Sequence, residues 1–148
     1  MKKFAVLLLI LASVAQAREY RAVFDCSSGD IRYVGSRMKV VEETIRLIEK
    51  RGDSARFAIT LHGGCVPIVA GRMEDVVSEA ELAFAKKAQE TLRRLHEKEG
   101  VDVVACAMSL EANGIDEGEV LPFVRISPDS FIETIGYQND GYALMTFP

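Results

Sequence analysis

Three cysteines, Cys26, Cys65 and Cys106, are the residues of this 148-residue sequence best suited to chemistry. A thiolate can act as a nucleophile, carry sulfur as a persulfide or bind a soft metal, and two thiols can form a disulfide. Because their number is odd, at least one of them has no disulfide partner within the chain. The high apolar content is sufficient for a hydrophobic core, so this is not a miniprotein held together by disulfides.

Cys106 lies where a buried strand is expected to pass into a short helix. The free N–H groups and the dipole of a helix start favour a thiolate, which would make Cys106 a nucleophile or a sulfur carrier. The alternative is a small apolar residue packed at a strand end, because free cysteine is among the most buried residue types.

The three cysteines and His62 also form a possible set of soft ligands for zinc or copper(I). Neither CxxC nor HxxxH spacing is present, so no metal and no cofactor is predicted. His62 is instead interpreted as a hydrogen-bonding partner of the loop backbone. The chain has no phosphate-binding glycine loop, no Gly-x-Ser-x-Gly elbow and no Rossmann fingerprint, so hydrolase and nucleotide-enzyme functions lack support.

Alternating strands and helices must position these side chains. Short β-prone or apolar runs predict five strands, at 20–24, 56–61, 101–105, 123–126 and 142–146. Helical spacing of apolar residues predicts one helix from Ser36 to Gly52 and a longer one over 79–99, opened by a capping box at Ser78 and terminated by Gly100. A helical turn is expected at 66–70, a short helix through Leu110, and a last helix begun by Ser127-Pro128.

Such alternation predicts a mainly parallel sheet covered by helices on both faces. Each cysteine follows a predicted strand, and ligands of parallel sheets gather at the carboxyl ends of the strands. We therefore expect Cys26, Cys65 and Cys106 at one edge of the sheet. Cys65 could pair with Cys106 as a resolving pair, or with Cys26 as a structural bridge that leaves Cys106 free.

The first seventeen residues resemble a cleavable secretory signal peptide. Lys2 and Lys3 precede an apolar run that is too short to span a bilayer, and Ala15-Gln16-Ala17 has the form that signal peptidase accepts. The prediction is export to the periplasm or beyond, with residues 18–148 forming one domain that is free of the membrane. The mature chain would carry 16 basic and 22 acidic residues, a net charge of −6 that argues against nucleic acid as a partner.

Four segments are similar to one known family, the DsrE/DsrF-like proteins, and to its DsrE/TusD sulfur-relay type. Val103–Ile115 resembles the family's strand, cysteine and short helix. The other three are the first strand and loop, the loop after the second strand and the approach to the last strand: Val23–Asp30, Leu61–Gly64 and Gln138–Ala143. The likeness covers essentially all of the mature chain, although an aliphatic residue often stands in the family at the place of Cys26.

The resemblance implies a three-layer α/β/α domain with a five-stranded sheet, which assembles into trimers or hexamers. It also implies that Cys106 carries a persulfide between donor and acceptor proteins or small sulfur compounds, as a sulfur carrier or sulfurtransferase. Cys65 and Cys26 are the further candidate site residues, because they are expected at the same edge of the sheet. A non-catalytic oligomeric scaffold of the same fold and a soft-metal site at the cysteine edge are the competing functions.

Overall fold

A single five-stranded sheet forms the centre of the computed structural model, which describes residues 17–98 and 100–148. The strand order is β4-β3-β2-β1-β5, and all neighbouring strands are parallel. The strands are β1 (Glu19–Cys26), β2 (Ser54–Leu61), β3 (Val101–Cys106), β4 (Arg125–Ser127) and β5 (Ala143–Phe147). The five predicted strands are therefore confirmed, with ends displaced by up to two residues.

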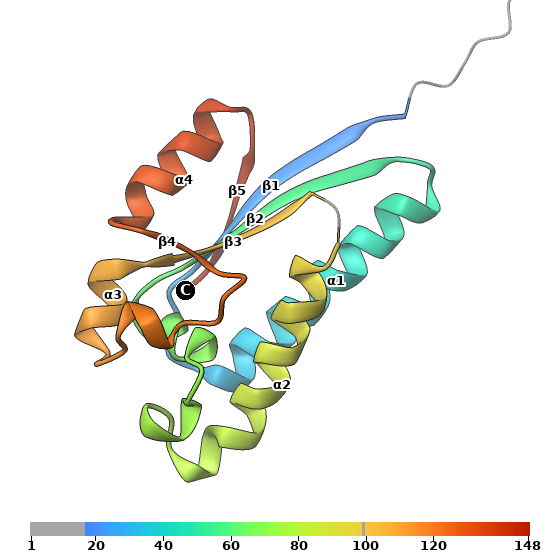
Figure 1. The fold of residues 1–148 in the computed structure, drawn as a ribbon. Coiled ribbons are helices and arrows are strands. Elements are labelled where there is room, and N and C mark those ends of the chain that lie inside the picture. The colour runs from blue at the N-terminus through green and yellow to red at the C-terminus, as the bar shows by residue number, and fades with distance from the viewer. Residues whose placement is uncertain (1–16, 99) are drawn as a thin grey trace, which may run out of the picture.

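Helices cover both faces of this sheet, as the sequence predicts (Figure 1). The chain moves from β1 to β2 to β3 in one direction, so right-handed crossovers place α1 (Ile31–Lys50) and α2 (Glu79–His96) together on one face. The return from β4 to β5 places α4 (Ser130–Asn139) on the opposite face. The shorter helices are α3 (Ala107–Ala112), η1 (Gly63–Val69), η2 (Met73–Asp75) and η3 (Glu117–Glu119).

The start of α1 is a correction to the sequence prediction. The helix begins at Ile31 because the Asp30 carboxylate accepts hydrogen bonds from the backbone N–H groups of Arg32 and Tyr33, each at 3.0 Å. The predicted cap, Ser36, lies inside the helix and donates to a backbone carbonyl of the preceding turn. The predicted end is close, since α1 stops at Lys50 and Gly52 has a φ of 80°.

The ends of the other long helices also differ from prediction. Ser78 precedes α2 as expected, but its hydroxyl donates to the Glu81 carboxylate at 2.6 Å and does not cap a backbone N–H. The helix ends at His96, several residues before Gly100. The last helix begins at Ser130, because the Asp129 carboxylate accepts from the Phe131 N–H at 2.9 Å and so acts as the cap.

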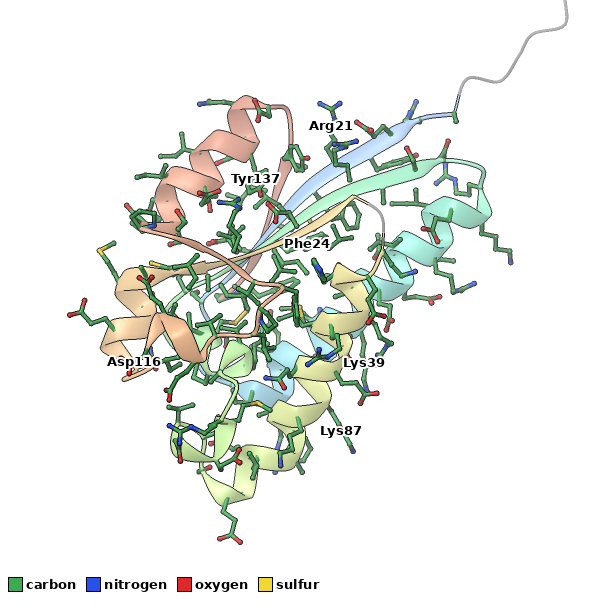
Figure 2. All side chains as sticks on the ribbon, viewed as in Figure 1. Arg21, Phe24, Lys39, Lys87, Asp116 and Tyr137 are labelled. Carbon is green, nitrogen blue, oxygen red and sulfur yellow. A yellow bond between two sulfur atoms is a disulfide. The ribbon has the colours of Figure 1, made fainter. Side chains whose placement is uncertain are left out.

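The two faces of the sheet have different chemistry. On the α1 and α2 face lies the hydrophobic core, where the predicted apolar stripes of both helices are buried except for the half-buried Leu82. On the other face, α4 directs polar side chains towards the sheet, and Figure 2 shows Tyr137 between that helix and the strands. None of the helices within the described residues is long and apolar enough to cross a membrane.

Candidate functional site

The three cysteines lie at the carboxyl ends of adjacent strands, as predicted. Cys26 is the last residue of β1 and Cys106 the last residue of β3, while Cys65 lies in η1 directly after β2. The strand order β3-β2-β1 places the Cys65 segment between the other two. All three thiols are thus on one edge, but they do not share one environment.

Cys26 and Cys65 form a disulfide, with their Cα atoms 5.9 Å apart. Both residues are fully buried. Because side chains alternate along a strand, Cys26 lies on the same face as Ala22 and Phe24, within the core formed with α1 and α2. Of the two pairings left open by the sequence, the structure therefore has the bridge that leaves Cys106 free.

Cys106 is a free thiol on the opposite face. Alternation along β3 puts it on the side of Asp102, whose carboxylate accepts a hydrogen bond from Tyr137 of α4. The residue is 3% exposed, so the thiol is almost closed to solvent. The surroundings of Cys106 are therefore the polar layer between the sheet and α4.

Hydrogen bonding favours the thiolate of Cys106. Burial raises its pKa, but hydrogen bonds from the side chains and backbones of Ser109 and Ser130 outweigh burial, and the net pKa lies below the ordinary value for a thiol. Ser109 belongs to α3 and Ser130 opens α4, so two helices meet at the sulfur. The thiol is thereby prepared for nucleophilic chemistry.

His62 is paired with Asp25, which corrects the predicted backbone role of the histidine. Nε2 of the imidazole lies 3.2 Å from the Asp25 carboxylate. The same carboxylate accepts hydrogen bonds from the hydroxyls of Thr60 at 2.9 Å and Thr134 at 3.5 Å. Strands β1 and β2 and helix α4 therefore each contribute to one polar cluster on the Cys106 side of the sheet.

The contact between His62 and Asp25 favours the charged forms of both, an imidazolium and a carboxylate. The hydrogen bond to Asp25 raises the pKa of His62, against an opposing effect of burial. Burial raises the pKa of Asp25, but hydrogen bonds from His62 and Thr60 more than offset it, so this pKa lies below the ordinary value. The charge of a Cys106 thiolate raises the pKa of His62 further, so the two groups lie within electrostatic range.

Two glycines hold the loop after β2 against its neighbours. Gly63 has a φ of 51°, in the left-handed region, and its N–H donates to the Ser109 hydroxyl at 2.9 Å. A Cβ on Gly64 would lie 2.5 Å from the Cα of Gly29, so only glycine fits there. The loop that follows His62 is therefore in close contact with the loop after β1 and with α3.

Residues 17–98 and 100–148 contain no cluster of three or more His, Cys, Asp or Glu side chains arranged to hold a metal ion. In the bridged state Cys26 and Cys65 offer no thiolate ligands. Of the four ligands considered from the sequence, only Cys106 and His62 retain a free donor atom.

Asp25 and its threonine partners were missed by reasoning from sequence. An available signal was the position of Asp25 as an acidic residue near the end of a strand, directly after the apolar run Ala22–Phe24. A second signal was Thr60 and His62, which are two residues apart and so face the same side of the sheet. A half-buried acid beside an imidazole is a typical feature of a functional site.

The fold and the free thiol define a class of protein: a three-layer α/β/α domain with one cysteine presented at the carboxyl edge of a parallel sheet. The pattern of the DsrE/DsrF-like family matches residues 22–147, and this chain belongs to that family. The family is linked to sulfur relay.

The chain is also similar to two other proteins. An uncharacterized protein of Aquifex aeolicus is 35% identical over 147 residues, which are 99% of this chain, and the chain spans 64% of that protein's length. The solved structure of a protein of unknown function, MTH1491 from Methanobacterium thermoautotrophicum, is similar in fold, with a TM-score of 0.65 and 21% identity. That likeness covers 86% of this chain and 99% of MTH1491.

Proposed function

We propose that this protein is a sulfur carrier or sulfurtransferase, in which Cys106 accepts sulfane sulfur as a persulfide and passes it to an acceptor. The observation that carries the proposal is the free Cys106 thiol, whose pKa is lowered by hydrogen bonds from Ser109 and Ser130 in spite of burial. A lowered pKa increases the fraction of thiolate, which is the form that attacks sulfur.

The surroundings of Cys106 suit a persulfide. The neighbouring side chains are small hydroxyl groups, Ser109 and Ser130, which donate to an anionic sulfur. Near-complete burial keeps competing thiols away from the bound sulfur. Transfer then requires α3 or α4 to move aside, since both helices contribute to the cover.

A non-catalytic scaffold is the second candidate, and the 3% exposure of Cys106 is the observation that favours it. Titration of the native, unreduced protein with a thiol reagent separates the two functions. A Cys106 that reacts rapidly supports the carrier, whereas one that reacts only after unfolding supports the scaffold.

The direct test is mass spectrometry of the mature protein after exposure to polysulfide or thiosulfate, without reductant. The carrier gains the mass of one sulfur atom on the peptide that contains Cys106. The Cys106→Ser variant, which keeps the Cys26–Cys65 bridge, gains none. If the native protein gains no sulfur on Cys106 with any of these donors, the proposal is refuted.

Export to the periplasm or beyond is part of the proposal. The predicted signal peptide, residues 1–17, lies outside the described residues except for Ala17. The Cys26–Cys65 disulfide supports export, because disulfides persist in oxidising compartments. Protein sequencing of the exported chain should begin at Arg18, and an intact N-terminus on the exported chain would contradict cleavage.

A homo-oligomer, as a trimer or hexamer, is also proposed. Helix α4 supports it, because its polar side faces the sheet and its outer side is apolar: Phe131, Ile132 and Ile135 are 65%, 63% and 56% exposed. Sedimentation of the mature protein should show the oligomer, and Ile132→Glu should shift it towards monomers. An unchanged distribution in that variant would exclude this surface from the interface.

A further inference from the structure

His62 and Cys106 occupy corresponding positions at the ends of neighbouring strands. Strands β2 and β3 are parallel, and their last paired residues are Leu61 and Ala105. The next residue of the chain is His62 after Leu61 and Cys106 after Ala105. Neighbouring strands lie about 4.8 Å apart, and paired residues face the same side of a parallel sheet. The imidazole is therefore a neighbour of the thiol across the strand pair.

Asp25 fixes the orientation of this imidazole. Its carboxylate contacts Nε2 of His62 at 3.2 Å and is itself held by the hydroxyls of Thr60 and Thr134. Since Nε2 is engaged, Nδ1 is the ring nitrogen that can serve a reacting group. A carboxylate, an imidazole and a nucleophile in this order form the usual arrangement of an activated cysteine or serine.

We propose that His62 is the general acid of sulfur transfer to Cys106, with Asp25 as the positioning residue that holds its ring. This inference rests on the proposed carrier function. It assigns the donor class as a persulfide of an alkyl thiol, R–S–SH, because such a donor releases a basic thiolate that needs a proton. Thiosulfate releases sulfite, which is a weaker base and leaves without one.

The chemical step balances without an external oxidant or reductant. The Cys106 thiolate attacks the outer sulfur of R–S–SH, the new bond to Sγ forms, and the donor S–S bond breaks. The electron pair of that bond leaves on R–S⁻, which takes the proton of the His62 imidazolium. The products are the Cys106 persulfide, R–SH and neutral His62, which regains its proton from water.

The charges that face His62 favour the required protonated form. They are Asp25 on β1, the Cys106 thiolate on β3 and Asp129 before α4, and all of them raise the pKa of the imidazole. The imidazolium is consequently more populated near neutral pH than that of a free histidine. A general acid is most effective when its pKa lies near the working pH.

The test compares two reactions of the same thiol in the mature protein. Persulfidation by glutathione persulfide needs a proton donor for the leaving group, whereas alkylation by iodoacetamide releases iodide and needs none. Both reagents must reach the same buried thiol, so a change in access alters both rates. The ratio of the persulfidation rate to the alkylation rate therefore reports the proton transfer. The variants are His62→Gln and the matched control His96→Gln, which changes the other histidine of the chain, exposed at the end of α2.

With His62→Gln, we expect the persulfidation rate to fall about 100-fold or more. The alkylation rate, measured at a pH where the thiol is fully ionised, should change less than about threefold. His96→Gln should leave both rates unchanged. An equal fall in both reactions would assign His62 a structural role only, and an unchanged persulfidation rate would remove His62 from the chemistry; either result overturns the inference.

Asp25→Asn provides a second readout that does not depend on the His62 variant. The NMR titration of His62 should move to lower pH, and the limb of the persulfidation profile that falls with rising pH should move with it. A profile that stays in place while the titration moves would refute the acid role. A native protein whose Cys106 takes no sulfur would refute the carrier function itself, a separate outcome from a persulfide that forms equally fast without His62.

Discussion

Removal of the Cys26–Cys65 bridge should cost a large part of the stability of this domain. The bridge closes a segment between residues 39 positions apart, and loop-closure entropy for that length corresponds to about 4 kcal/mol at 25 °C. In a domain of this size, a loss of 4 kcal/mol lowers the melting temperature by roughly 12 °C. The bridge is best removed by the double variant Cys26→Ala, Cys65→Ala, because a single replacement would leave a reactive thiol in the core.

Chemical unfolding followed by circular dichroism, with and without a reductant, measures this effect. The native protein should lose about 4 kcal/mol of unfolding free energy when reduced, while the double variant should be insensitive to the reductant. Cys106→Ala is the matched control, because it also removes a buried cysteine sulfur and yet should keep the full response to reductant. A loss below about 1 kcal/mol, or three reactive thiols in the unfolded, unreduced protein, would refute the bridge and the reasoning built on it.

Substitutions in the loop after β2 and around the thiol should each have a measurable effect. Gly64→Ala should destabilise the fold by about 1–3 kcal/mol, measured by denaturant unfolding, because the added Cβ would lie 2.5 Å from backbone of the facing loop. The raised pKa of His62 stabilises the folded state fully below the pKa of the unfolded state, and this contribution is lost as pH rises through the pKa of the folded state. Asp25→Asn should therefore flatten this part of the profile of unfolding free energy against pH. An unaltered profile would contradict the pairing of His62 with Asp25. Ser109→Ala should raise the pKa of Cys106, seen as a shift of the alkylation rate profile to higher pH, and no shift would mean that the hydroxyl does not stabilise the thiolate.

Periodicity allowed the sheet and the long helices to be predicted from sequence. The apolar stripe of α1, with Met38, Val41, Ile45 and Ile48, is buried as its spacing indicates. Helix starts were predicted less well, because several residues near each start could act as a cap. Asp30 and Asp129 are the N-caps in place of the nearby serines, because carboxylates accept strongly from the exposed N–H groups of a first turn.

The candidate site was predictable only as far as topology determines it. The carboxyl-edge rule placed all three cysteines correctly, because each follows a strand of one parallel sheet. The choice between the two disulfides depended on which face each side chain takes at the strand end. Asp25 and His62 meet through side-chain geometry between two strands, and spacing along the chain does not encode that contact.

The position of the bridge and the free thiol on opposite faces has a kinetic consequence. Thiol–disulfide exchange needs the attacking sulfur to approach the bridge directly, and here the thiol and the bridge lie on opposite faces of the sheet. The molecule can therefore keep one sulfur pair oxidised and one sulfur reduced without scrambling. In an oxidising compartment, such isolation would protect the crosslink from attack by the reactive sulfur of its own chain.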